Sequence, residues 1–298
     1  MPEVVTIGEC MAVLYPPKPV EIERSHNLLL DIGGAEANLA IRLQRLGHTA
    51  RFISRVGNDP FGRRILNTLG EHGVDTTFVT VDPANPTGLY FREWLPDGAR
   101  KVYYYRAGSA ACALTPADLP PAAFTGARIV HLTGITPALS PGCAATVARA
   151  IELAHLAGAQ VSFDPNYRPR LWSESEAREA LLPLISRIDI LLMGHEDARA
   201  IFGTDEPGAS MEQVASLGPK IVVLKQAERG ACALSGGRFI QVPAHPVEKV
   251  VDPVGAGDAF DAGFLAGLLR QYDLEAALNF GARLGAAAVG TLGDYAGD

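Results

Sequence analysis

Short β-rich runs alternate with helical patterns along most of this 298-residue chain. Arg51 to Val56 precedes a helical pattern from Phe61 to Glu71, and Arg128 to Leu132 precedes one from Gly142 to Ala157. The alternation continues through the strand-like runs Gln160 to Asp164, Ile188 to Met193 and Lys220 to Leu224. A strand-helix repeat of this kind predicts an α/β fold, with a mostly parallel sheet covered by helices on both faces.

Two segments, at about residues 15–32 and 87–106, contain extended stretches without an intervening amphipathic helix. In the second, Gly88 to Trp94 alternates as a strand does, Pro96-Asp97-Gly98 is a turn sequence, and Lys101 to Tyr105 is the returning strand. We expect both segments to form a small β-lid on a single domain spanning residues 1–298. Its aromatic surface could also pair two subunits, so we expect a homo-oligomer built from lid-mediated dimers.

Composition narrows the class of protein. The net charge of -7 argues against nucleic acid or an anionic membrane as partner, because both favour basic surfaces. The apolar stretches fall short of a membrane span and the N-terminus carries no signal-peptide pattern, so we expect a cytoplasmic protein. The four cysteines, at positions 10, 112, 143 and 232, show no metal-ligand spacing, and we expect them to be reduced and buried.

The run from Asp252 to Phe260, DPVGAGDAF, joins a turn of small residues to a helix start. Gly255 and Gly257 allow backbone N–H groups to converge on an anion, and the positive end of the helix adds to the attraction. Asp258 could accept a proton from an attacking hydroxyl. It could equally cap a helix from Ala259 to Arg270.

A second glycine motif, Gly33-Gly34-Ala35-Glu36-Ala37-Asn38, precedes an apolar helical pattern that ends at Gly47. Its glycines permit close backbone approach to a ligand, and Asn38 can donate and accept hydrogen bonds. The alternative is a tight strand-to-helix turn followed by an ordinary polar helix residue. A dinucleotide-binding dehydrogenase is disfavoured, because Gly8-Glu9-Cys10 follows the first strand in place of a Gly-x-Gly-x-x-Gly motif.

The order and separation of the two glycine motifs resemble the PfkB carbohydrate kinase family, whose members have a ribokinase-like fold. The likeness runs from about Val4 to the C-terminal helix. Within the family the chain is most similar to the 2-keto-3-deoxygluconate kinases, through Gly33 to Asn38, Tyr103 to Ala111 and Phe163 to Trp172. The resemblance implies ATP-dependent phosphorylation of the terminal (C6) hydroxyl of that acid sugar, with Mg²⁺ as a cofactor. It also allows for a monovalent cation.

The resemblance assigns roles to the residues around the phosphates. Asp258 is the general base, and Gly255, Ala256 and Gly257 stabilise charge on the transferred group. The residues implied for ATP are Lys225, Gly230, Gly255, Ala256, Gly257 and Asn279. Ala227 stands where the family often has Gly, and Gly194 and Asp197 stand where it often has Asn and an acidic residue near Mg²⁺. We therefore assign no direct metal ligand. Asp164, Asn166 and Glu196 stay candidates for residues that contact the ligands of Mg²⁺ and not the ion itself.

The sugar-binding positions implied by the resemblance are Gly34, Tyr90, Tyr104, Arg106, Arg168, Asp258 and Asp294. Arg106 and Arg168 discriminate between substrates, because a planar guanidinium can bind a carboxylate through two charge-assisted hydrogen bonds. Alternatives remain for several of these side chains. The tyrosines could simply pack in a lid strand, and Arg168 could form a surface ion pair with Glu174 or Glu176.

Two other functions stay open. The chain could be another PfkB kinase, for fructose, ribose or a nucleoside, and the arginine pair is what argues for an acid sugar. It could also be a non-catalytic sugar sensor, which the intact Gly255 to Asp258 motif argues against. The sequence leaves the C4 configuration of the sugar undetermined.

Overall fold

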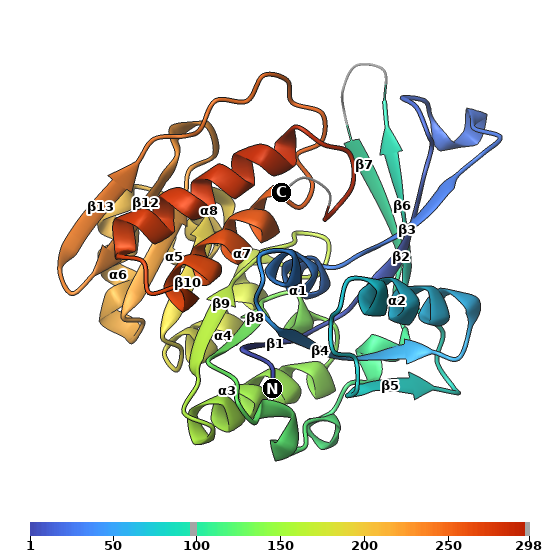
Figure 1. The fold of residues 1–298 in the computed structure, drawn as a ribbon, viewed down its shortest axis with the longest axis horizontal. Helices are drawn as coiled ribbons and strands as arrows, with labels where there is room; N and C mark the ends of the chain where they lie inside the picture. Colours follow the sequence, from blue (N-terminus) through green and yellow to red (C-terminus); the bar gives the residue numbers. More distant parts are fainter. Residues whose placement is uncertain (96–99, 296–298) are drawn as a thin grey trace.

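The computed structural model describes residues 1–95 and 100–295, so the predicted turn Pro96-Asp97-Gly98 lies outside the described residues. These residues form a large sheet and a small one (Figure 1). The large sheet has nine strands in the order β13-β12-β11-β10-β9-β8-β1-β4-β5. Their bounds are β1 Val4–Ile7, β4 Ala50–Gly57, β5 Val79–Asp82, β8 Ile129–Thr133, β9 Gln160–Asp164, β10 Ile190–Gly194, β11 Ile221–Lys225, β12 Ala231–Ser235 and β13 Arg238–Val242.

The large sheet is parallel from β5 to β11, and β12 and β13 continue it antiparallel. Helices cover both of its faces (Figure 1). They are α1 Ala35–Arg45, α2 Pro60–Glu71, α3 Pro141–Leu156, α4 Glu174–Ile185, α5 His195–Phe202, α6 Pro207–Leu217, α7 Ala256–Leu269 and α8 Leu274–Val289. The α/β prediction is confirmed.

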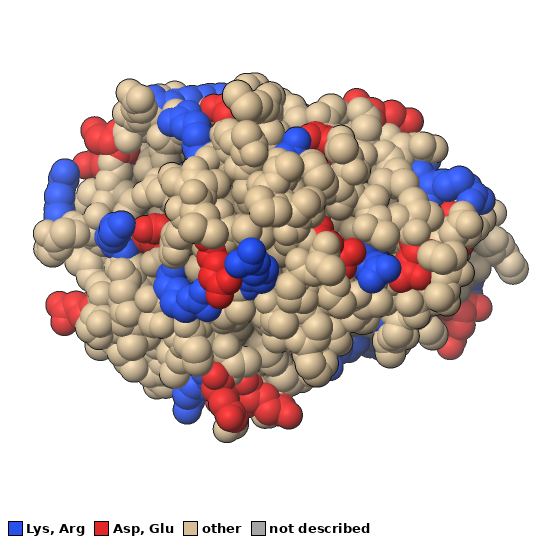
Figure 2. Space-filling model, turned by 90° about the horizontal axis from the view of Figure 1, so that it is seen from below, with Lys and Arg blue, Asp and Glu red and all other residues tan. Residues whose placement is uncertain are grey.

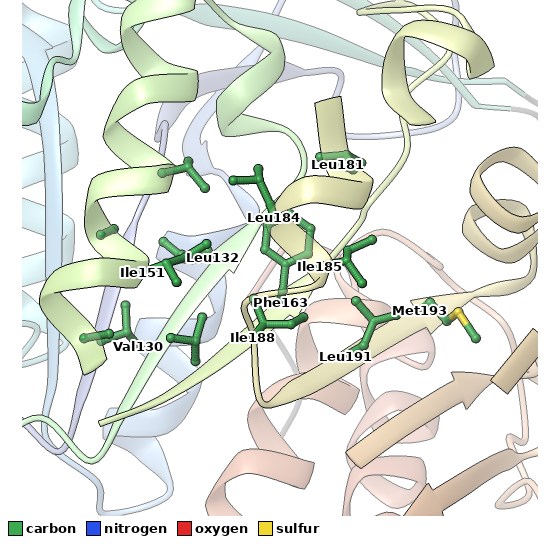
Figure 3. Packing of buried hydrophobic residues seen from close by; sticks show 14 of the residues in the cluster. Val130, Leu132, Ile151, Phe163, Leu181, Leu184, Ile185, Ile188, Leu191 and Met193 are labelled. Carbon is green, nitrogen blue, oxygen red and sulfur yellow. The ribbon is translucent and has the colours of Figure 1, made fainter. Parts of the chain in front are cut away.

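Alternating strand residues supply two separate cores. Val5 and Ile7 of β1 face a core shared with α3 to α6, whereas Val4 faces a core shared with α1, α2, α7 and α8. In the first core, Phe163 of β9 lies among apolar side chains of β8, β10, α3 and α4 (Figure 3). Because its strands are buried on both faces, the sheet is a rigid base for the loops at its strand ends.

The small sheet has the strand order β3-β2-β6-β7. Its strands are β2 Met11–Tyr15, β3 Leu29–Gly33, β6 Leu89–Trp94 and β7 Arg100–Tyr105. The strands β6 and β7 pair antiparallel from Leu89–Tyr105 to Trp94–Arg100, while β2 and β6 are parallel. This sheet starts at Met11, four residues before the extended segment noted in the sequence, and includes a short 3-10 turn at Ile22–Arg24. It stands at one end of the molecule beside α1 and α2 (Figure 1).

Within the described part of the chain, no helix combines the length and apolar character needed to cross a membrane. Acidic and basic side chains are interspersed over the face shown in Figure 2. All four cysteines are free; Cys10, Cys143 and Cys232 are buried as predicted, whereas Cys112 is partly exposed. Cys112 lies in the short 3-10 turn Ala110–Ala113 that follows the small sheet, where packing is less complete than inside the large one.

Candidate active site

The start of α7 combines a backbone turn with close packing. Gly255, the residue before the helix, has a φ of 77°, and a side chain there would also collide with the carbonyl oxygen of Asp294. Both facts require glycine. The helix begins at Ala256, three residues before the predicted start, so Asp258 lies in its first turn and the prediction that Asp258 caps the helix is wrong. The Ala256 N–H donates to the carbonyl of Pro253 at 3.3 Å, which leaves Gly257 and Asp258 as the better anion donors.

The two glycine motifs meet at Asp258. Asn38 of α1 donates from Nδ2 to Asp258 Oδ2 at 2.7 Å, although 220 residues separate them. Asn38 is 3% exposed, so it is more than an ordinary polar residue on a helix surface. Burial raises the pKa of Asp258 above its usual range, while the Asn38 hydrogen bond and the charges of Arg168 and Lys225 act in the opposite direction. A carboxylate held in one orientation with a raised pKa is suited to accept a proton.

Close packing also fixes Gly34, which precedes α1. A side chain at Gly34 would collide with the carbonyl oxygen of Glu9, and one at Gly33 would collide with the hydroxyl of Tyr90. The first turn of α1 is thus pressed against the end of β1 and against the small sheet. These contacts fix the backbone of the motif, and its predicted close approach to a ligand stays a prediction.

A second buried carboxyl lies in the same turn. Glu36 is fully buried, and its Oε1 accepts hydrogen bonds from Thr133 at 2.7 Å and Thr136 at 2.9 Å. Burial raises the pKa of Glu36 to about 7, against the opposing effect of the threonine hydrogen bonds. Glu36 was not predicted as a site residue. The sequence did carry a signal for it, because Glu36 is an acidic residue that follows the glycine pair Gly33-Gly34 and precedes the apolar pattern of the helix.

Lys225 binds two aspartates. Its Nζ lies 2.9 Å from Asp164 Oδ2 and 3.0 Å from Asp261 Oδ1. Burial alone would lower the pKa of Lys225, but the two carboxylates outweigh it and raise the pKa, so the ammonium stays charged. A side chain at Gly257 would come within 3.8 Å of Nζ, which places Lys225 beside the first turn of α7. Asp261 was missed by the sequence analysis.

The candidates around the metal divide by burial. Asp164 is buried, binds Lys225 and accepts a hydrogen bond from the Asn166 N–H at 2.9 Å. Glu196 is exposed. Asp197 accepts from the N–H groups of Gly194 at 2.6 Å and Tyr167 at 2.7 Å. Burial and the charge of Asp164 raise the pKa of Asp197 to about 6. Among the residues that the structure describes, no group of three or more His, Cys, Asp or Glu side chains is arranged to hold a metal ion.

The predicted nucleotide residues come from several elements: Lys225 ends β11, Gly230 precedes β12, Gly255 to Gly257 begin α7 and Asn279 lies in α8. Gly230 has a φ of 89° and no room for a side chain, because Val242 O is too close. Ala227, which stands where glycine is common in the family, has a φ of 49°, a left-handed conformation that costs a non-glycine residue about 1 kcal/mol or more. Asn279 of α8 is exposed, and its Oδ1 lies 3.0 Å from His245 Nε2. Near them, residues 246–249 and the α8 end at Ala286 line an open pocket of about 260 Å³.

The two predicted carboxylate-binding arginines differ. Arg106 Nε donates to Glu9 Oε2 at 2.7 Å, and Glu9, which is 3% exposed, also accepts from Ser109 Oγ at 2.6 Å. Arg168 is exposed, and within the described residues its guanidinium forms neither a hydrogen bond nor the alternative ion pair with Glu174 or Glu176. The charge of Arg168 lowers the pKa of Asp258, so the two lie close enough to interact. Glu9 was not predicted as a partner.

Tyr90 and Asp294 bind each other. The Tyr90 hydroxyl donates to Asp294, and Arg92 Nη1 donates to the other carboxylate oxygen at 2.7 Å. Burial raises the pKa of Asp294 to about 6, although Arg92 and Tyr90 favour its ionised form. Tyr90 also packs in the core of the small sheet, which agrees with the alternative that the tyrosines pack in a lid strand. Tyr104 lies beside it and is exposed. Arg92 was not predicted as a site residue.

Comparison with known proteins identifies the family to which the chain belongs. Residues 1–297 match the pfkB family carbohydrate kinases. The chain is 34% identical to a 2-dehydro-3-deoxygalactonokinase of Haloferax volcanii over 99% of this chain and 93% of the relative. It is 33% identical to a 2-dehydro-3-deoxygluconokinase of Bacillus subtilis, covering 99% of this chain and 92% of the relative. A fructokinase of Klebsiella pneumoniae is 36% identical over 88% of this chain and 83% of the relative.

The fold agrees with solved structures. A ribokinase-type protein from E. coli, solved in complex with ATP and Mg²⁺, superimposes with a TM-score of 0.90 at 26% identity. The match covers 99% of this chain and 95% of that one.

Proposed function

We propose that this chain, which belongs to the PfkB family of carbohydrate kinases, transfers the γ-phosphoryl group of ATP to the C6 hydroxyl of 2-keto-3-deoxygluconate. The observation that carries the proposal is the 2.7 Å contact between Asn38 and Asp258 at the start of α7, close to the free guanidinium of Arg168. Together these residues offer a proton acceptor, an anion-binding helix end and a cation.

In the proposed reaction, Asp258 removes the proton of the C6 hydroxyl while that oxygen attacks the γ-phosphorus. The bond between phosphorus and the bridging oxygen of ADP breaks as the new O–P bond forms. The N–H groups of Gly257 and Asp258 stabilise charge on the transferred group, and the positive end of α7 adds to this effect. Asn38 keeps Asp258 in the orientation that the transfer needs.

Mg²⁺ fits this site through ATP and its own waters, because the described residues offer buried carboxylates but no ready set of three ligands. When bound, Mg²⁺ neutralises phosphate charge. Asp164 is the residue we propose to contact its waters, since its Oδ2 binds Lys225, whose Nζ lies beside Gly257 at the start of α7. Adenine would occupy the open pocket between residues 246–249 and α8, beside Asn279. Gly230 would contact the ribose and phosphates through its backbone.

The acid end of the sugar is assigned to the arginines. Arg168 is free to form a bidentate bond with a carboxylate. Arg106 is oriented by Glu9 and can offer only the edge of its guanidinium that Glu9 leaves open. Gly34, Tyr104 and the Tyr90–Asp294 pair complete the proposed sugar-binding surface.

A fructokinase is the second candidate. The observation in its favour is the ion pair between Arg106 and Glu9, which neutralises one of the two cations that an acid sugar would use. An ATP-turnover screen decides between the two. It would include 2-keto-3-deoxygluconate, its galactose-derived C4 epimer, fructose, ribose and a nucleoside. A preference for fructose would replace the proposal, and sugar binding without turnover of any compound would indicate a sensor.

We also propose that the small sheet acts as a lid and pairs with a second copy of the chain. Its exposed apolar side chains are Leu29, Leu30, Tyr103, Tyr104 and Tyr105. The strand pairing places Leu30, Tyr103 and Tyr105 on one face of the sheet, and Leu29 and Tyr104 on the other. An exposed apolar sheet face of this kind is a common site of subunit contact. Sedimentation should show a dimer or a multiple of one, and Tyr105→Asp should dissociate it. A strict monomer at micromolar concentration would contradict the pairing and leave the lid itself untouched.

A further inference from the structure

The side chain of Arg92, a residue of β6, extends from the small sheet and contacts two other segments of the chain. It is 2% exposed, and its Nη1 lies 2.7 Å from Asp294 Oδ1 and 3.0 Å from Asp252 Oδ2. Asp252 precedes the start of α7, and Asp294 follows the end of α8. A single buried guanidinium therefore joins three parts of the chain.

Both acidic segments shape the turn of residues 253–257 that leads into α7, which we call the phosphate loop. Asp252 lies three residues before Gly255, and its Oδ1 accepts from the Val254 N–H at 3.2 Å. The backbone carbonyl of Asp294 packs against Gly255 so closely that a side chain there would not fit. A shift of either carboxylate that binds Arg92 would therefore change the backbone conformation at the start of α7.

Other side chains of the small sheet reach the same two segments. Arg100 of β7 donates from Nη2 to the carbonyl of Val251 at 2.6 Å, and its Nε is 3.8 Å from Asp252. The Tyr90 hydroxyl donates to Asp294. Arg92 is the centre of this contact, because it alone of the three lies within 3.0 Å of both carboxylates.

We infer that Arg92 couples the small sheet to the phosphate loop, so that sugar and ATP bind cooperatively. The inference rests on the proposed function, in which the small sheet covers the sugar and the loop binds phosphate. A buried guanidinium between two carboxylates cannot move away from one segment without leaving a charge unpaired. The sheet and the loop therefore favour the same arrangement, and a ligand that stabilises one stabilises the other.

A purely structural role predicts a different result. If Arg92 only stabilised the fold, its replacement would lower the melting temperature and weaken both ligands independently. The ratio between ATP affinity with and without sugar would stay the same. That ratio is the coupling factor, and it is reciprocal between the two ligands.

The test measures the coupling factor by calorimetry, using Mg²⁺ with a non-hydrolysable ATP analogue, in the presence and absence of the sugar that the wild type phosphorylates. We expect at least about fivefold coupling in the wild type. Arg92→Lys keeps the charge, but its side chain ends one atom short of the Nη1 position that contacts both carboxylates, so it should bring the factor to within about twofold of one.

The matched control is Glu93→Gln, on the adjacent residue of the same strand. Glu93 accepts from the Ile22 N–H at 2.8 Å and from the Tyr103 hydroxyl at 3.1 Å, so it holds the small sheet together without reaching the loop. This variant should lower the melting temperature and retain wild-type coupling.

Three results would overturn the inference: no coupling in the wild type, full coupling in Arg92→Lys, or equal loss in Glu93→Gln. If Arg92→Lys does not fold, Asp252→Asn removes one of the two ion pairs, and the same outcomes apply to it. Because the sugar is whichever compound the wild type turns over, an error in the acid-sugar assignment changes the ligand used and not the test.

Discussion

The two ends of the proposed sugar site are built differently. At the phosphate end, the protein makes its own contacts: Asn38 binds Asp258, and Asp294 packs on Gly255. At the acid end, Arg106 is paired with Glu9 while Arg168 is exposed without a partner among the described side chains. The phosphate end is therefore organised before any ligand binds, and the acid end holds a charge that a substrate can neutralise.

This difference separates catalysis from specificity. Groups that are already held in place stabilise a transition state without further reorganisation. An exposed arginine must lose side-chain entropy when it binds, and only a strong charged contact compensates for that loss. We therefore expect substitutions at the phosphate end to affect every sugar, and substitutions at the acid end to affect acid sugars selectively.

The largest effect is expected at Asp258. Asp258→Asn keeps the shape of the side chain and removes the proton acceptor, so kcat should fall by about 10²-fold or more for every sugar accepted. Folding and sugar affinity should stay close to wild type, which thermal melting and calorimetry would check. A variant with wild-type kcat would show that another group accepts the proton.

Glu36 gives the second prediction at the phosphate end. Burial raises its pKa from 4.5 to about 7, so the folded protein holds this proton more tightly than the unfolded chain does. The stabilisation is complete below pH 4.5 and is lost as the pH rises towards 7. Glu36→Gln lacks this titration. Between pH 5 and pH 8 the wild type should lose on the order of 3 kcal/mol more unfolding free energy than the variant.

Urea unfolding at several pH values measures that difference. Glu71→Gln, on the exposed end of α2, is the control for removing one acidic charge. The same pH dependence in wild type and Glu36→Gln would mean that Glu36 stays ionised in the folded state. The phosphate end would then be more solvated than its packing indicates.

Sequence patterns predicted the local features of the site. The strand-helix alternation gave the α/β class, and the two glycine motifs gave Asn38 and Asp258, which the structure brings into contact. The start of α7 was placed three residues late, because the left-handed φ of Gly255 lets the chain enter the helix earlier than a side-chain cap at Asp258 would. The local sequence pattern does not distinguish a helix that starts after Gly255 from one that starts after Asp258.

Partners from distant segments were not predictable in the same way. Glu9, Arg92 and Asp261 carry no periodic or motif signal, and each acts through an ion pair with a residue at least 36 positions away. Lys225 was assigned to ATP from its position in a resembling loop, and the structure shows it bound to Asp164 and Asp261. Such pairings depend on strand order, which the alternation leaves undetermined.

Arg168 tests the acid end. Each charged hydrogen bond contributes about 1.5 to 3 kcal/mol, so Arg168→Ala should lower kcat/KM for the acid sugar by about tenfold or more. Fructose has no carboxylate and should be affected much less. Arg149→Ala, at a partly exposed position of α3, controls for the loss of one positive charge. Equal losses with both sugars would remove the carboxylate assignment and make the two ends of the site functionally alike.

The smallest effect is expected at Asn38, and it tests how far the phosphate end is tuned. Asn38 donates to the ionised form of Asp258, and its hydrogen bond lowers the pKa that burial raises. In Asn38→Ala the pKa of Asp258 should therefore rise further. Since the reaction needs ionised Asp258, the acid limb of the kcat/KM profile should move to higher pH. Water replaces part of the lost bond, so a shift of up to about one pH unit is expected.

Asn67→Ala, on the exposed face of α2, is the matched asparagine control and should leave the profile unchanged. The direction of the shift is the informative part, because disordering Asp258 would lower the rate at every pH without moving the limb. A limb that moves to lower pH would mean that Asn38 opposes ionisation of Asp258. The contact between the two motifs would then hold the helix ends together without tuning the base.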